Sequence, residues 1–177
     1  MGLKEIDERT LRQVFAGELN PATGDAFGRL RVSQVQTLFD SKQLVDAQPL
    51  YFDDQQTTGT GTTSTYTAAK TASVLAVSNL TAGTRVRQTF RRFNYQPGKS
   101  QLAYITFTGQ APQTGITRRV GLFDQNNGVF LEQTSAGMFF VIRNATADVT
   151  RVPQAQWNVD KCDGTGESKV SIDLSKS

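Results

Sequence analysis

Hydrophobic positions along this 177-residue chain fall into three successive patterns. In residues 1–20, apolar side chains recur about once per helical turn among charged ones (Leu3, Ile6, Leu11, Val14 and Phe15). This spacing predicts a short amphipathic helix that ends near Gly17. Residues 21–54 carry large apolar side chains at irregular intervals, which is typical of an extended arm that docks onto another surface.

From residue 55 onwards, the chain changes to Thr, Gly, Gln and Ser interrupted by short alternating apolar runs. Residues 55–64 contain only those four residue types and are predicted to form a polar loop. Strands are predicted at a spacing of about ten residues, which is typical of an antiparallel sandwich. Their ranges are Tyr66–Ser78, Thr84–Tyr95, Gln101–Gly109, Thr117–Asp124, Gly128–Gln133, Met138–Asn144 and Val149–Val152, with a further edge strand around Val170, Ile172 and Leu174.

The predicted fold is therefore mainly β. We expect an antiparallel, jelly-roll-like β-sandwich preceded by a short N-terminal helix and an extended arm. The helix and anchoring arm occupy residues 1–54, and the β-domain occupies residues 55–177. The alternation so close to residue 177 leaves open whether the β-domain is complete there or continues.

Charge is distributed unevenly, although the formal net charge is only +3. Residues 55–123 hold eight basic and no acidic residues, whereas residues 1–54 hold nine acidic and six basic ones. Residues 124–177 are again acidic, with seven acids and five bases. A basic middle thus lies between two acidic flanks, and the two signs complement each other within the chain.

Composition excludes much of the common chemistry of enzymes. The chain has no histidine, so imidazole catalysis and histidine-ligated metals are unavailable to it, and its single cysteine, Cys162, cannot form an internal disulfide. Asp53 and Asp54 are a poor glycosidase pair, because adjacent strand residues face opposite ways. The acidic turn from Asp160 to Glu167 lacks the spacing of a calcium loop. We therefore expect no enzyme, no cofactor and no metal. The apolar runs are also too short for a membrane span.

A cluster of basic residues is the strongest charged candidate: Arg85, Arg87, Arg91 and Arg92, interleaved with Phe90, Phe93 and Tyr95. Proteins that bind single-stranded nucleic acid use this combination, in which arginines contact the phosphates and aromatic side chains stack on the bases. The alternative is that this basic interface pairs with the acidic residues Asp40, Asp46, Asp53 and Asp54, or with a neighbouring subunit. We favour pairing, because the net positive charge is small.

Several long motifs go beyond composition. They read AFGRLRVS from residue 26, TLFDSKQ from residue 37, QPLYFDD from residue 48, and RVRQTFRRFNYQPGKS from residue 85. The stretches GITRRVGLFD from residue 115 and WNVDK from residue 157 continue the pattern. Over most of residues 22–166, the chain resembles a family of virion structural proteins of tailed bacteriophages.

The resemblance implies a non-enzymatic virion component made in the host cytoplasm. We expect the adaptor or base of a tail fibre or similar appendage, with a capsid decoration protein as the alternative and a single-stranded nucleic-acid-binding module as a second alternative. Expected partners are other virion proteins, in the tail or capsid, and further copies of the chain in a symmetric homo-oligomer such as a trimer, with no membrane partner. The residues expected to anchor it are Phe27, Arg29, Arg31, Leu38, Phe39, Tyr51 and Phe52.

Overall fold

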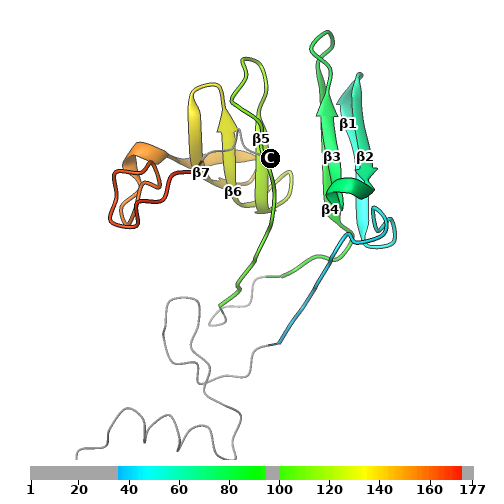
Figure 1. Ribbon diagram of the computed structural model, residues 1–177, viewed down its shortest axis with the longest axis horizontal. Helices are drawn as coiled ribbons and strands as arrows, with labels where there is room; N and C mark the ends of the chain where they lie inside the picture. The colour runs from blue at the N-terminus through cyan, green and yellow to red at the C-terminus, as the bar shows by residue number, and fades with distance from the viewer. Residues whose placement is uncertain (1–35, 95–99, 173–177) are drawn as a thin grey trace, which may run out of the picture. The chain divides into compact units, whose positions relative to one another are not determined.

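The computed structural model describes residues 36–94 and 100–172 of the chain. The helix predicted in residues 1–20 lies outside these ranges. The chain divides into two compact units, Met1–Asn94 and Tyr95–Ser177, and each is described by itself. Both consist mainly of antiparallel strands, as predicted (Figure 1). Within the described residues, no helix is long and apolar enough to cross a membrane.

The first unit contains two antiparallel ribbons, drawn from cyan to green in Figure 1. Strand β1 (Phe52–Gly59) pairs with β4 (Gly83–Thr89), and β2 (Thr62–Thr67) pairs with β3 (Ala72–Val77). Gly59 and Gly61 turn the chain from β1 into β2 at positive φ values of 66° and 74°. A Cβ atom at Gly59 would lie 2.0 Å from the Ala82 carbonyl oxygen, so only glycine fits this turn.

Three details of the first unit differ from the prediction. Residues 55–64 are not a polar loop, because β1 and β2 include most of them and backbone hydrogen bonds need no apolar side chain. β1 also runs across the predicted boundary between residues 54 and 55. The single strand predicted over Tyr66–Ser78 is divided by a short 3-10 turn, η1 (Ala68–Lys70), after which Thr71 adopts a left-handed conformation with φ 46°.

The second unit contains one four-stranded sheet in the order β5-β6-β7-β8, drawn from green to orange in Figure 1. Its strands are β5 (Arg118–Phe123), β6 (Gly128–Thr134), β7 (Gly137–Asn144) and β8 (Ala147–Pro153), followed by the 3-10 turn η2 (Gln154–Gln156). All four strands lie where the alternating pattern predicts them. In the β5–β6 turn, the Asp124 carboxylate accepts hydrogen bonds from the backbone N–H groups of Asn126 and Asn127, both at 2.7 Å.

The predicted strand Gln101–Gly109 is not observed as one. Residues 102–110 have no ladder partner among the described parts of the chain. Nevertheless, the alternate residues Ala103, Ile105 and Phe107 line one shallow hollow together with residues of β5, β6 and β7, as they would in a strand. At the end of the described chain, Asp163 and Ser171 form an isolated bridge rather than a strand.

The two faces of the second sheet differ. The cross-strand register places Phe130, Val141, Glu132 and Phe139 on one face, together with three arginines from β5, β7 and β8. Phe130 and Val141 are the most deeply buried side chains among the described residues, although only one sheet layer is present. The opposite face carries apolar side chains on three strands: Val120, Leu122, Val129, Leu131, Phe140 and Ile142.

Candidate assembly surfaces

An aromatic cluster joins the arm to the first ribbon. The Phe39 ring centroid lies 6.2 Å from that of Tyr51, 6.0 Å from that of Phe52 and 5.8 Å from that of Phe93. The contacts to Tyr51 and Phe52 are edge-on, which is a favourable geometry for aromatic pairs. Phe39, Phe52 and Phe93 are half-buried, and Tyr51 is exposed. The cluster therefore holds three segments together while leaving part of its surface open.

Next to the aromatic cluster, one carboxylate binds two arginines of the predicted basic interface. Asp54 lies opposite Arg87 in the β1–β4 register. The Arg85 Nε–H donates to Asp54 Oδ1 at 2.7 Å, and Arg87 Nη1–H donates to Asp54 Oδ2 at 3.2 Å. The Ser64 hydroxyl also donates to this carboxylate, which links β2 to the β1–β4 ribbon. Two of the four predicted interface arginines thus share one carboxylate within the chain.

The environment of Asp54 determines its charge. Burial alone raises the pKa of this carboxyl, but hydrogen bonds from Ser64 and Arg85 and the charge of Arg85 outweigh it, so the pKa lies below its usual value. The Arg87 guanidinium stacks over the Phe52 ring at 4.3 Å and also donates to the Ala47 carbonyl oxygen. Arg87 Nε is buried and has no hydrogen-bond partner. This arginine is therefore built into the junction and is closed to an external phosphate.

Further hydrogen bonds fasten the arm to its own ribbons. Arg91 Nη1–H donates to the Leu38 carbonyl oxygen at 2.8 Å. The Tyr66 hydroxyl donates to the Gln43 carbonyl oxygen at 3.1 Å, and the Ser73 hydroxyl donates to the Gln43 side-chain oxygen at 2.8 Å. The described part of the arm therefore packs on its own chain. Docking of the arm onto another subunit stays a prediction.

The structure brings together most of the candidate residues that it describes. Leu38, Phe39, Tyr51, Phe52, Arg85, Arg87 and Arg91 all take part in the arm–ribbon junction. Arg92 is exposed beyond the end of β4. Phe27, Arg29 and Arg31 lie outside the described residues.

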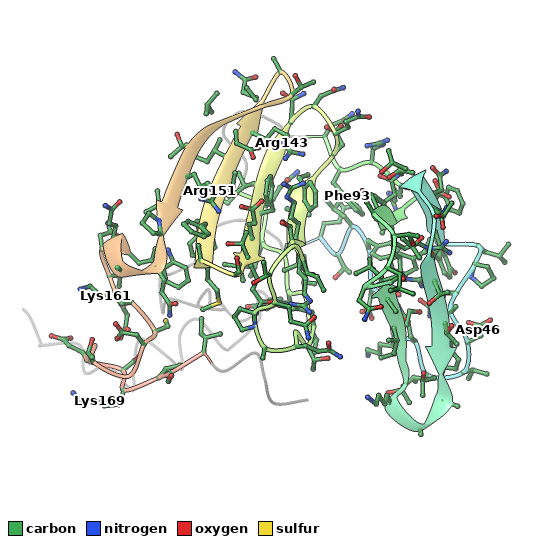
Figure 2. All side chains as sticks on the ribbon, turned by 90° about the horizontal axis from the view of Figure 1, so that it is seen from above. Asp46, Phe93, Arg143, Arg151, Lys161 and Lys169 are labelled. Carbon is green, nitrogen blue, oxygen red and sulfur yellow. The ribbon has the colours of Figure 1, made fainter. Side chains whose placement is uncertain are left out.

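A second charged cluster, which the sequence analysis missed, crosses the sheet of the second unit. Glu132 on β6 is buried, and its Oε2 accepts from Arg119 Nε–H on β5 at 2.8 Å. Its Oε1 lies 2.9 Å from Arg151 Nη2 on β8. Arg151, which Figure 2 labels on this sheet, also places its guanidinium 3.3 Å from the centroid of the Phe139 ring. One carboxylate thus clamps both outer strands of the sheet.

Arginines also cover the aromatic core of this face. The guanidinium carbons of Arg143 and Arg119 lie 4.9 Å and 5.6 Å from the centroid of the Phe130 ring. Arg143 is held in turn by Asp148, whose Oδ1 lies 2.8 Å from Arg143 Nε, and this hydrogen bond lowers the pKa of Asp148. The arginine face of the sheet is therefore closed by its own side chains.

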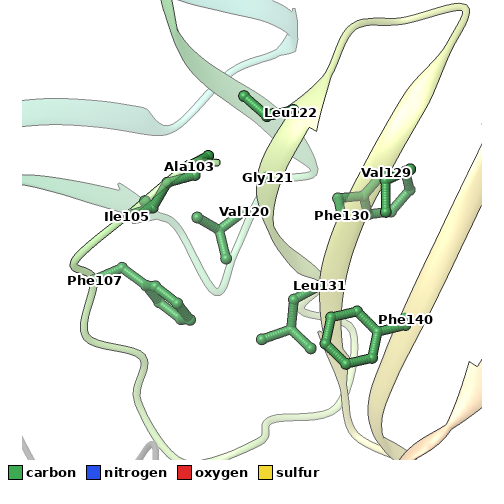
Figure 3. Close-up of a pocket in the computed structure, with 10 residues that line it drawn as sticks. All are labelled: Ala103, Ile105, Phe107, Val120, Gly121, Leu122, Val129, Phe130, Leu131 and Phe140. Atoms are coloured by element: carbon green, nitrogen blue, oxygen red, sulfur yellow. The ribbon is translucent and has the colours of Figure 1, made fainter. Parts of the chain in front are cut away.

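The opposite, apolar face is open and forms a shallow hollow of about 310 Å³ (Figure 3). Ala103, Ile105 and Phe107 form one wall, and side chains of β5, β6 and β7 form the other. On β7, the Phe140 ring stacks against Trp157, with the centroids 4.7 Å apart. Every lining residue is apolar or glycine, so the hollow offers no side-chain group for general acid–base chemistry.

The acidic turn after Trp157 satisfies its carboxylates internally. Asp160 accepts from the backbone N–H groups of Cys162 and Ser168, and Asp163 accepts from Thr165. Among the described residues, no group of three His, Cys, Asp or Glu side chains is placed to hold a metal ion. Comparison of the chain with protein-family models, curated proteins and solved structures gives no match.

Proposed function

We propose that the chain is a non-enzymatic structural subunit of a tailed-phage virion, namely the adaptor or base of a tail fibre or similar appendage. The main observation behind this proposal is that the chain buries few apolar side chains of its own. In the described residues, the buried apolar side chains are Phe130, Met138 and Val141, all in the second unit. A unit with so little buried apolar surface gains little free energy from folding alone. Such a chain suits an assembly in which neighbouring subunits complete the core.

The exposed apolar side chains support the same proposal. They lie on the arm, on β3 of the first unit and on the apolar face of the second, and they include Val74, Leu75, Val77, Leu122, Val129, Phe140 and Ile142. Large exposed apolar patches mark interaction surfaces. We propose that such contacts complete a jelly-roll-like sandwich in a symmetric homo-oligomer on the particle, where repeated copies make weak contacts additive.

We place the contact with the particle in the part of the arm before residue 36. The described part is already engaged by Arg87, Arg91 and Tyr66 of its own chain. The motif residues Phe27, Arg29 and Arg31 therefore become the anchoring candidates. The engagement of Arg85 and Arg87 by Asp54 also disfavours the nucleic-acid alternative.

The test is the incorporation of variants into particles that lack the wild-type protein. Arg29→Glu together with Arg31→Glu should abolish incorporation, as should deletion of residues 1–35, which keeps the whole of β1 in the chain. Lys42→Glu is the matched charge control, because Lys42 is exposed and makes only a long ion pair with Asp40 at 3.8 Å. Normal occupancy of the Arg29 and Arg31 variant, or equal loss in the control, would refute anchoring by the arm.

A further inference from the structure

Residues 102–109 have the properties of a β-strand that lacks a neighbouring strand. Alternate side chains from this segment line the hollow, whereas Leu102 and Tyr104 lie in exposed positions. Its composition of Tyr, Ile, Phe and Thr is typical of strands. Even so, the segment has no ladder partner within residues 36–94 and 100–172. Its backbone groups are thus available for pairing with another chain.

The segment also lacks the usual protection against such pairing. Exposed edges of natural sheets carry lysines, prolines or other charges that prevent association. No charged residue occurs between residues 100 and 117, and no proline occurs between 101 and 109. The arginine face of the same unit differs from this segment, because Arg119, Arg143 and Arg151 cover its aromatic side chains.

The sequence of the segment is complementary to itself in one antiparallel register. When two copies pair about a two-fold axis at Ile105, Ile105 faces its own copy and Ala103 faces Phe107. On the side that faces the hollow, the small Ala103 of each copy therefore lies opposite the large Phe107 of the other. On the other side, Tyr104 faces Thr106, an aromatic and β-branched pair that stabilises strands.

The exposed apolar area agrees with an interface of this kind. Eight large apolar side chains of the segment and the apolar face are each between 42% and 79% exposed: Leu102, Tyr104, Ile105, Phe107, Leu122, Val129, Phe140 and Ile142. At about 150–250 Å² for each of the three aromatic side chains, and somewhat less for each aliphatic one, the eight together expose on the order of 700 Å². A standard interface buries about 800 Å² on each partner.

We propose that residues 102–108 pair antiparallel with the same segment of a second copy, about a two-fold axis at Ile105, and so cover the hollow. This inference rests on the homo-oligomer of the proposed function and makes it more specific. It requires an even number of copies around this contact, in contrast to the trimer that the sequence allowed. Phe107 of each copy would then lie beside Ala103 of the other, at the rim of the hollow.

Charge exchange at the axis tests this register in the full chain. Ile105→Lys and Ile105→Glu each place like charges face to face, so each variant alone should raise the dimer dissociation constant at least about tenfold in sedimentation or native mass spectrometry. An equimolar mixture should recover dimers that contain one copy of each variant. This recovery also shows that the variants fold.

The matched control is Val159→Lys and Val159→Glu, because Val159 is in the same unit and 93% exposed. Both variants should dimerise like the wild type. A disulfide provides a second measurement: Ile105→Cys in a Cys162→Ser background should link two copies under oxidation, because opposed strand residues lie about 4.5–5.5 Å apart at Cα. Val159→Cys in the same background should not.

The outcomes separate this inference from the proposed function. A monomeric or strictly trimeric wild type overturns the inference, as do Ile105 variants that associate normally or a mixture that fails to recover dimers. Coverage of the hollow by another segment of the same chain, or by a different protein, would appear as a monomer or a mixed complex and also overturns it. Dimers that are absent from particles would refute the virion role alone.

Discussion

Replacement of the buried Glu132 by glutamine should destabilise the second unit far more than the loss of a solvent-exposed carboxylate would. Glu132→Gln keeps the size of the side chain but removes the charge that two arginines share. Its side chain is only 5% exposed, whereas those of Arg119 and Arg151 are each 40% exposed. The change therefore isolates the electrostatic contribution of the clamp.

The magnitude follows from this difference in exposure. Loss of one member of a fully buried ion pair costs about 3–5 kcal/mol. Here both arginines can regain water, so we expect a loss of about 2 kcal/mol in the free energy of unfolding. For a unit of this size, that loss corresponds to a decrease of roughly 10 °C in Tm.

Urea unfolding followed by tryptophan fluorescence measures this unit directly. Trp157 is the only tryptophan, and it stacks on Phe140 in the same unit. The transition midpoint should decrease with an unchanged slope. Asp148→Asn is the matched control, because it makes the same carboxylate-to-amide change at a side chain that is 31% exposed and pairs with one arginine, and it should cost about 1 kcal/mol. A Glu132→Gln effect equal to or smaller than the control would show that the clamp contributes no more than the single Arg143–Asp148 pair.

Three further predictions concern the junction and a close backbone contact. Phe39→Ala should lower the hydrogen-exchange protection of β1 and β4 by about 1–2 kcal/mol, whereas Leu50→Ala, at an 88% exposed position, should leave it unchanged. Because the pKa of Asp54 is lowered in the folded state, its contribution is present above the unfolded value of 3.8 and is lost as the pH falls below it. Asp54→Asn should remove this acid-dependent loss of protection. Gly121→Ala should lower the free energy of unfolding of the second sheet in urea by about 2 kcal/mol or more, the usual cost of overpacking, because the added Cβ would lie 2.5 Å from the Val129 carbonyl oxygen. Gly115→Ala is the comparison: the added Cβ would meet no neighbour, so only the positive φ of 81° costs free energy, about 1 kcal/mol.

The local sequence pattern was sufficient to predict strands where turn residues and the apolar alternation agreed. Strands β5 to β7 begin and end within about a residue of their predicted bounds, because Asn-Gly and Ala-Gly turns separate clear apolar alternations. The prediction of strands failed where turn residues or apolar alternation were missing. Ala68-Ala69-Lys70 carries no turn signature, yet the chain reverses there, and the polar residues of β1 form a strand by backbone pairing.

The candidate site could be predicted only in part for a related reason. Pairing of Arg85 and Arg87 with Asp54 was predicted, because opposite charge in neighbouring segments is visible in the sequence. The Glu132 clamp depends on the register of β5, β6 and β8, which no local pattern specifies. Similarly, the contact of Phe39 with Phe93 joins residues far apart in the chain.

The most direct test of the virion proposal is the amount of this protein in purified particles. Quantitative mass spectrometry of density-purified virions, with heads and tails then separated, gives copies per particle and their location. The proposal predicts a fixed number of copies that remains with the tail fraction. Absence from purified particles would contradict the virion role, and recovery with heads alone would indicate a capsid decoration protein instead.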